Sequence, residues 1–365
     1  MNLDPQLTER RLIEQFLDLL RELPDVNARL KALENVGPPG DKRRDAQIDV
    51  EIAGKAFTLF IEAKTSVYPR DVRQVLWQIR QFGSDRRIAE REDAVSVLVA
   101  ESISPGAKEL LREERVGYYD SGGSLFLPAR GAYLYIDKPP PKTLAKAVRS
   151  MFSGRRAQVL HTLLIHHQDW FGVKELAEQA MVSPATASQA LSELERFDWL
   201  TSRGQGPNKE RRLAEPGSLL DAWVKQLASI RAPALRRYYV ASTDTEKLID
   251  RIGQVCDSHE VEYAITHEAA AQRYTPFLSS VSQVRCRMLA GGAAEAAIGE
   301  LNARVVNEGV NLVILEAKSH GDFLFREQVR GAWLASPIQV YLDLLLGEGR
   351  GKEMADHLRH ERIGF

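Results

Sequence analysis

The chain has 365 residues, with 49 Lys and Arg against 50 Asp and Glu, which gives a formal net charge of -1. This balance excludes a histone-like basic protein, so any nucleic-acid-binding surface must be a local patch. A domain typically holds roughly 100–200 residues, so we expect two or three domains. Two cysteines cannot cross-link a chain of this size. We therefore expect both thiols to be reduced, as in a cytoplasmic protein. The sequence shows no apolar signal segment and no membrane span, so we expect no contact with a membrane.

The first part of the chain alternates between helical and strand patterns. Helices around a mixed sheet predict an α/β or α+β fold, and the stiff segment Pro139–Pro141 predicts that this domain spans residues 1–138. Two strands, 48–52 and 57–63, are expected to form a hairpin around a Gly54-Lys55 turn. The other expected elements are helices over 7–23, 69–82 and 105–114 and strands over 94–100, 116–119, 124–127 and 132–136.

The expected hairpin places two carboxylates and a lysine on one face of the sheet. Side chains alternate along a strand, so Asp49 lies opposite the apolar row of its strand, and Glu62 and Lys64 lie opposite theirs. The expected turn pairs Asp49 with Phe60, diagonally from Glu62 and close enough to share an ion. It also puts both apolar rows on one side, which supports the register. The other predicted pairs are Ile52 with Phe57, Val50 with Leu59 and Ile48 with Ile61.

These residue types suit a divalent cation. Asp49, Glu62 and the backbone carbonyl of Ala63 supply the oxygen ligands that Mg²⁺ (or Mn²⁺) prefers. A bound cation lowers the pKa of a coordinated water and neutralises charge on a phosphodiester. Lys64 would orient the attacking water or stabilise the charged transition state.

Asp49 with Glu62-Ala63-Lys64 resembles the core motif of the PD-(D/E)XK nuclease superfamily, over roughly the first 138 residues. The resemblance implies a restriction-endonuclease-like fold with Asp49 and Glu62 as metal ligands and Lys64 as a catalytic residue. It also implies a supporting acid on the preceding helix, here Glu14 or its rival Glu9. A glutamine on the following helix is implied too, here Gln78. The usual proline before the aspartate is replaced by Ile48.

Two simpler interpretations of this motif stay open. Spacings of this kind arise by chance, because an exposed strand face is often charged. A domain of this fold can also bind DNA without cutting it. The agreement of the hairpin register, the flanking helices and Gln78 favours the nuclease-like fold over chance.

A helix-turn-helix pattern follows the linker. Residues 173–180 carry the apolar spacing of a first helix, and Ser183 and Pro184 are the cap and first residue of a second helix that runs to Phe197. Two short strands over 200–213 predict a wing, whose loop is rich in basic residues that suit a phosphate backbone. The expected DNA contacts are Ser183, Thr186, Ser188 and Gln189 of the helix and Arg203, Lys209, Arg211 and Arg212 of the wing. The alternative is a protein–protein module, and the clustered basic residues favour DNA.

The last third of the chain carries no catalytic pattern. Its segments 263–271 and 336–344, together with the winged helix, resemble the AbiEi family of antitoxins and transcriptional regulators of type IV toxin–antitoxin systems, over roughly residues 150–365. The resemblance implies promoter binding by the winged helix and a cognate toxin as a protein partner. It also implies a C-terminal α/β domain. A second Glu-Ala-Lys, at 316–318, has no matching aspartate on a paired strand and is interpreted as chance.

The sequence therefore supports two main hypotheses. The first is a DNA-binding protein with domains at 1–138, 142–216 and 217–365, whose first domain is a Mg²⁺-dependent deoxyribonuclease that acts in defence against foreign DNA. The second is a non-catalytic transcriptional regulator or antitoxin. A third, weaker alternative is an adaptor in which neither domain touches DNA. The DNA site, the oligomeric state and the identity of any partner stay open.

Overall fold

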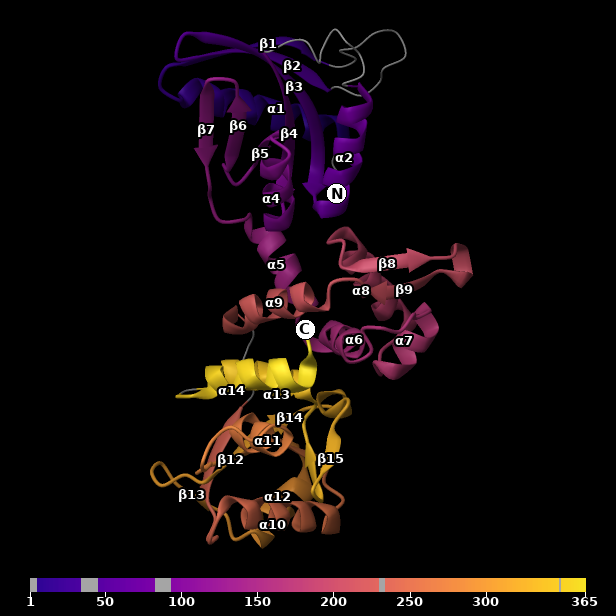
Figure 1. Cartoon of the computed structure of the whole chain (residues 1–365), viewed down its shortest axis with the longest axis vertical. Helices are drawn as coiled ribbons and strands as arrows, with labels where there is room; N and C mark the ends of the chain where they lie inside the picture. Colours follow the sequence, from indigo (N-terminus) through magenta and orange to yellow (C-terminus); the bar gives the residue numbers. More distant parts are fainter. Residues whose placement is uncertain (1–4, 34–44, 83–92, 230–233, 348) are drawn as a thin grey trace. The chain divides into compact units, whose positions relative to one another are not determined.

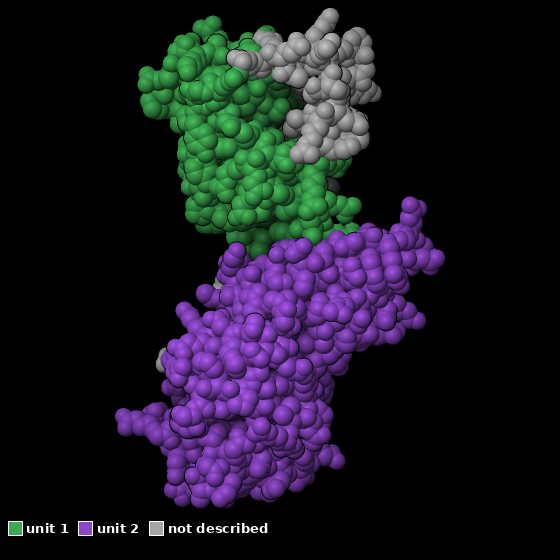
Figure 2. Space-filling model, viewed as in Figure 1, with its two compact units in different colours: residues 1–148, 193–198 green, residues 149–192, 199–365 purple. Residues whose placement is uncertain are grey.

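The computed structural model describes residues 5–33, 45–82, 93–229, 234–347 and 349–365 (Figure 1). The contacts divide the chain into unit 1, residues 1–148 with 193–198, and unit 2, residues 149–192 with 199–365 (Figure 2). The three domains expected from the sequence stay a prediction. No helix among the described residues is both long and apolar enough to cross a membrane.

Unit 1 is built on a seven-stranded mixed sheet whose strand order follows the chain, β1 to β7. Strands β3, β4 and β5 are parallel to one another, and the remaining neighbours are antiparallel. This mixed sheet with helices on it agrees with the expected fold class. The elements are α1 (Pro5–Glu22), β1 (Val26–Leu33), β2 (Ala46–Ile52), β3 (Lys55–Val67), α2 (Pro69–Phe82), β4 (Ala94–Ile103), α4 (Pro105–Glu113), β5 (Gly117–Asp120), β6 (Leu125–Ala129) and β7 (Ala132–Ile136).

The two faces of this sheet belong to different apolar cores. On one face, α1 packs Leu12 and Phe16 against strand residues such as Ile61. On the other face, α2 and α4 cover Leu98 and its neighbours. Because side chains alternate along β3, Glu62 and Lys64 point away from the face that α1 covers.

The β2–β3 hairpin has a different register from the one the sequence predicted. Its two-residue turn is Ala53-Gly54, with φ of +49° and +78°, and not Gly54-Lys55. Both central residues of a type I′ turn need positive φ, which this pair adopts. The turn lies one residue earlier, so every cross-strand partner moves by two residues. The observed pairs are Ile52 with Lys55, Val50 with Phe57, Ile48 with Leu59 and Ala46 with Ile61.

The segment after the linker is a winged helix. Helices α7 and α8 are joined by a tight turn in which Met181 has φ of +53°, and strands β8 and β9 form the hairpin of the wing. Phe171 pairs with Arg211 and so adds a third short strand to that hairpin. The elements are α5 (Lys142–Met151), α6 (Gly154–Ile165), α7 (Val173–Gln179), α8 (Pro184–Arg196), β8 (Leu200–Arg203), η1 (Gly206–Asn208) and β9 (Glu210–Leu213).

The C-terminal part of unit 2 holds a second seven-stranded mixed sheet, in the order β13-β10-β14-β12-β11-β16-β15. Helix α10 packs with α12, and α11 packs with α13 and α14 (Figure 1). Its elements are α9 (Pro216–Gln226), η2 (Leu227–Ser229), β10 (Leu235–Tyr239), α10 (Thr245–Ser258), β11 (Tyr263–Thr266), α11 (His267–Tyr274), β12 (Val284–Leu289), α12 (Gly292–Glu300), β13 (Arg304–Val305), β14 (Leu312–Ala317), η3 (His320–Phe323), β15 (Glu327–Val329), β16 (Ala332–Leu334), α13 (Pro337–Leu345), α14 (Gly351–Leu358) and η4 (Arg359–Ile363).

Candidate functional site

Two of the predicted catalytic side chains lie together on β3. Lys64 Nζ is 3.1 Å from Glu62 Oε1, and both side chains are partly exposed, at 32% and 26%. They share one face of the strand because they are two residues apart. The ammonium group is thus held beside the carboxylate.

The structure does not bring Asp49 to this pair, which corrects the sequence prediction. Asp49 pairs with Thr58, whose hydroxyl donates to Asp49 Oδ1 at 3.2 Å. Its other oxygen lies 3.3 Å from Lys31 Nζ of β1. Thr58 precedes Glu62 by four residues, which is roughly 13 Å along a strand. The cause is the turn at Ala53-Gly54, which shifts the register and carries Asp49 away from Glu62.

Asp45, and not Asp49, lies beside the Glu62-Ala63-Lys64 tripeptide, and Gln47 holds the place opposite Phe60 that was expected for Asp49. The Asp45 N–H donates to Ile61 O at 3.0 Å, and Asp45 Oδ2 accepts a hydrogen bond from the Ala63 N–H at 2.7 Å. The paired register ends at Ala46 with Ile61, and Asp45, the bend residue before β2, is hydrogen-bonded to Ile61 and Ala63, the two neighbours of Glu62. These two hydrogen bonds place Asp45 at the level of Glu62 along β3. The signal that could have found Asp45 was the correct turn, because counting back from it brings Asp45 to the end of the hairpin, next to Ile61.

Asp45, Glu62 and the Ala63 carbonyl are the oxygen groups that this end of the hairpin offers to a cation. The N–H and C=O of one strand residue point to the same edge, so the Ala63 carbonyl faces the side on which Asp45 lies. Mg²⁺ usually takes one or two carboxylates and completes its shell with water and substrate phosphates. Within the described residues, no group of three or more His, Cys, Asp and Glu side chains could hold a metal.

The predicted supporting residues are not gathered at this site. Glu14 lies on the solvent side of α1, 55% exposed, and pairs with Arg10 at 3.0 Å. Helix α1 covers the face of the sheet opposite to Glu62, so Glu14 is not placed to support it. The rival Glu9 is a partly buried residue of the same helix. Gln78 belongs to α2, but its side chain lies outside the described part of the structure.

The start of helix α8 presents the short polar side chains that the sequence predicted. Ser183 Oγ accepts from the Thr186 N–H at 3.2 Å and lies 2.9 Å from Thr186 Oγ1, so these two residues cap the helix. Gln189 is exposed, Ser188 is half-buried, and Ala187, Ala190, Leu191 and Leu194 face the core. The polar face of α8 is therefore accessible.

The wing corrects one predicted DNA contact. Arg211 is only 9% exposed, because its position on β9 points inward with Leu213, so it does not offer its guanidinium to a ligand. Arg203 is exposed but forms an ion pair with Glu210 at 2.6 Å. Lys209 and Arg212 are half-buried. The wing thus presents less positive charge than its sequence suggested.

A groove of about 600 Å³ lies between α7, the start of α8 and the tip of the wing. Gly172, Val173, Pro184 and Pro207 line it together with three charged residues, Lys174, Glu175 and Glu178. Because two glutamates outnumber the single lysine, the charged lining of this groove is acidic overall and does not favour a phosphate backbone.

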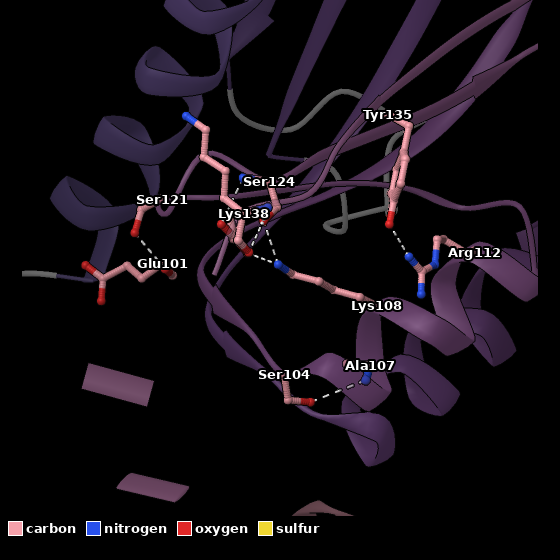
Figure 3. A network of polar contacts seen from close by, with 10 residues as sticks. Glu101, Ser104, Ala107, Lys108, Arg112, Ser121, Ser124, Tyr135 and Lys138 are labelled. Atoms are coloured by element: carbon pink, nitrogen blue, oxygen red, sulfur yellow. Dashed lines mark hydrogen bonds and ion pairs between the residues drawn. The ribbon is translucent and has the colours of Figure 1, made fainter. Parts of the chain in front are cut away.

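Unit 1 also contains a sealed polar cluster that does not form a binding site. Lys108 of α4 lies 2.6 Å from Asp120 Oδ2 and donates to Ser124 Oγ at 2.7 Å. Ser124 Oγ also accepts from the Lys138 N–H at 3.1 Å (Figure 3). Asp120 and Ser124 are fully buried and Lys108 is 6% exposed. The cluster therefore ties α4, β5 and the segment before the linker together.

The C-terminal segments 263–271 and 336–344 meet around a buried carboxylate. Asp343 of α13 accepts from Thr266 Oγ1 at 2.5 Å, from Gln339 Nε2 at 2.8 Å and from Arg287 Nη2 at 2.6 Å. The Arg287 guanidinium lowers the pKa of this carboxyl, although burial alone would raise it. His267 has a lowered pKa because it is buried, and its φ of +55° is strained. This arrangement joins β11, β12 and α13.

No protein-family model and no curated protein matches the sequence. Among solved structures, the chain is similar to NolR from Sinorhizobium fredii, with 18% sequence identity and a TM-score of 0.18. The likeness covers 24% of this chain and 88% of that chain. At this TM-score it carries no argument, so the winged-helix assignment rests on the elements described above.

Proposed function

We propose that this chain is a DNA-binding protein whose N-terminal sheet carries a Mg²⁺-dependent centre for phosphodiester hydrolysis. The observation that carries the proposal is the hydrogen bond from the Ala63 N–H to Asp45 Oδ2 at 2.7 Å, which places Asp45 beside Glu62, with Lys64 paired to Glu62 at 3.1 Å. Asp45 replaces Asp49 in the set of residues that the sequence suggested.

Each residue has a distinct task in this proposal. Asp45 and Glu62 hold the cation, and the hydrogen bond from Ala63 keeps the Asp45 carboxylate in place. A bound cation supplies an activated water and charge neutralisation at the phosphate. The Lys64 ammonium donates to a non-bridging phosphate oxygen or orients the attacking water, and so stabilises the charge that develops in the transition state.

The winged helix supports DNA as the substrate. It offers the exposed polar face of α8 and a wing with accessible arginine, the two elements that such modules place against duplex DNA. Defence against foreign DNA is the biological setting that this combination favours.

The test compares three variants for plasmid and single-stranded DNA cleavage in Mg²⁺ or Mn²⁺. Asp45→Asn and Lys64→Ala should each lower the rate by about 100-fold or more. Asp49→Asn, the matched control in the same hairpin, should keep the wild-type rate. Mn²⁺ binding, measured by calorimetry, should be lost in Asp45→Asn and kept in Asp49→Asn. Equal loss in both aspartate variants, or in neither, would contradict this site.

The second candidate function is a non-catalytic regulator or antitoxin. The ion pair between Lys64 and Glu62 favours it, because each group already satisfies the other in the absence of substrate. In that case the wild type binds DNA with no cleavage under any metal condition, and it co-purifies with a toxin partner.

A further inference from the structure

The sheet of the wing brings three side chains from different strands to one face. The Phe171 N–H donates to Arg211 O at 2.8 Å, and the Arg211 N–H donates to Phe171 O at 2.9 Å. This antiparallel pairing places Trp170 opposite Arg212, which is itself opposite Thr201. Residues opposite one another in a sheet share a face. Trp170 therefore lies beside Arg212 on the outer face, while Phe171 and Arg211 are buried on the inner face.

Trp170 contacts two arginines at once. The guanidinium carbon of Arg203 lies 4.3 Å from the centre of the Trp170 ring, and that of Arg212 lies 5.0 Å from it. A guanidinium within about 6 Å of an indole ring is attracted by the negative face of the ring. Both arginine side chains, which are flexible in isolation, are thus held over one rigid aromatic surface.

The two arginines differ in their acidic neighbours. Arg203 is paired with Glu210 at 2.6 Å, and the two side chains are 55% and 38% exposed. Arg212 has no ion pair with any residue of the described part of the chain. The face formed by Trp170, Arg203, Glu210 and Arg212, here called the Trp170 face, thus carries two positive charges and one negative charge.

We infer that Trp170 is a positioning residue that holds Arg203 and Arg212 for contact with the phosphates of duplex DNA, and that Glu210 competes with phosphate for Arg203. This rests on the proposed DNA binding and specifies which part of the wing performs it. The planar guanidinium group matches phosphate oxygens with two parallel N–H donors. Stacking on Trp170 reduces the number of side-chain conformations that each arginine loses on binding. The indole ring itself carries no charge and reads no base.

The test measures the affinity of the full-length protein for a fluorescent mixed-sequence DNA duplex as a function of salt concentration. Each phosphate contact contributes about 0.9 to the slope of log affinity against log salt. Arg212→Ala should lower this slope by about one, and Trp170→Ala should lower it by up to about two although it removes no charge. Trp170→Phe keeps an aromatic surface and should restore most of the slope.

Two further variants separate charge from position. Glu210→Gln should tighten binding at fixed salt by roughly two- to fivefold, because it releases Arg203 from an exposed ion pair. Arg237→Ala, which removes an exposed arginine of β10 in the C-terminal sheet, should leave affinity and slope unchanged. Circular dichroism of each variant confirms that the chain is folded.

The outcomes distinguish this inference from the proposed function. If the wild-type protein binds no duplex DNA, both the proposed DNA binding and the role of Trp170 are wrong. If it binds an acidic protein instead of DNA, the Trp170 face is the binding surface for that partner. A wild type that binds duplex DNA while Trp170→Ala keeps the full salt slope overturns only the role of Trp170.

Discussion

Asp45 Oδ2 accepts a hydrogen bond of 2.7 Å from the backbone N–H of Ala63, the residue between Glu62 and Lys64. The first residue before β2 is therefore fixed to the middle of the Glu-Ala-Lys tripeptide on β3. Asp49 is held instead by Thr58 and Lys31, at a different level of the same hairpin. Asp45, and not Asp49, is therefore the aspartate that lies next to Glu62.

Ala53 adopts φ of +49° in the β2–β3 turn, a conformation that costs an L-residue other than Asn or Asp roughly 1 kcal/mol. Ala53→Asn creates an Asn-Gly pair, the preferred sequence for a type I′ turn. We expect a rise in unfolding free energy of about 0.5–1 kcal/mol, measured by urea denaturation. Gly54→Ala, at φ of +78°, should destabilise the hairpin. Stability that is unchanged in both variants would contradict the observed turn.

The buried ion pair of Lys108 and Asp120 should respond non-additively to mutation. Asp120→Asn leaves the Lys108 ammonium buried without its counter-charge, at a cost of about 3–5 kcal/mol. Adding Lys108→Met removes the stranded charge, so the double variant should be more stable than Asp120→Asn alone. Hydrogen exchange of β5 and β6 amides measures the difference. A double variant that is less stable than either single variant would argue against a charged pair.

His161 should make stability depend on pH. Burial, together with the charge of Arg287, lowers its pKa to about 4 from an ordinary value of 6.5. Between these values the unfolded chain binds the proton and the folded chain does not, so stability falls as the pH drops from 6.5 to 4. The loss is on the order of 3 kcal/mol.

His161→Gln should remove most of this dependence, because glutamine does not titrate and can still bond Ser336. The residual dependence includes that of His267, whose pKa is also lowered by burial. His360→Gln, a change at an exposed histidine, is the control. Denaturant midpoints measured across the pH range report the effect, and identical pH profiles for wild type and His161→Gln would refute it.

Both cysteines should be unreactive in the folded protein. Burial raises the pKa of Cys256 to about 12 and raises that of Cys286 as well, so neither forms the reactive thiolate at neutral pH. Iodoacetamide labelling followed by mass spectrometry should find both thiols unmodified in the native chain and modified after denaturation. Fast labelling without denaturant would show that the C-terminal core opens.

Much of the fold of unit 1 could be predicted from the sequence, because the spacing of apolar residues indicates where helices and strands lie. Helix 69–82 and strand 132–136 have the predicted bounds. Strand β1 was not predicted, although residues 26–32 alternate strictly between apolar and polar side chains, so this alternation was a signal that the prediction missed. The hairpin register was wrong for a different reason. A shift of two residues keeps every side chain on the same face, so hydrophobic pattern alone cannot distinguish the two registers, and only the turn does.

The prediction of the functional residues contains that register error and a second error, the assignment of Arg211 to DNA. The exchange of Asp49 for Asp45 follows directly from the register. Arg211 was assigned to DNA from its charge, whereas the alternation of β9 places it beside Leu213 on the inner face. Trp170 was missed because its contact with Arg203 and Arg212 depends on a third strand that the wing acquires from the segment before α7.

The Ala53-Gly54 turn has a consequence for how this hairpin can diverge. Asp45 and Glu62 lie at equal distances from the turn along the two arms of the hairpin. A single insertion in one arm would break that symmetry and separate the two carboxylates, whereas one insertion in each arm would preserve it. Related chains can therefore change nearly every residue of the hairpin and even its length. What they must keep is an equal number of residues between the turn and each carboxylate. Equal spacing is therefore a better sign of homology in this hairpin than residue identity.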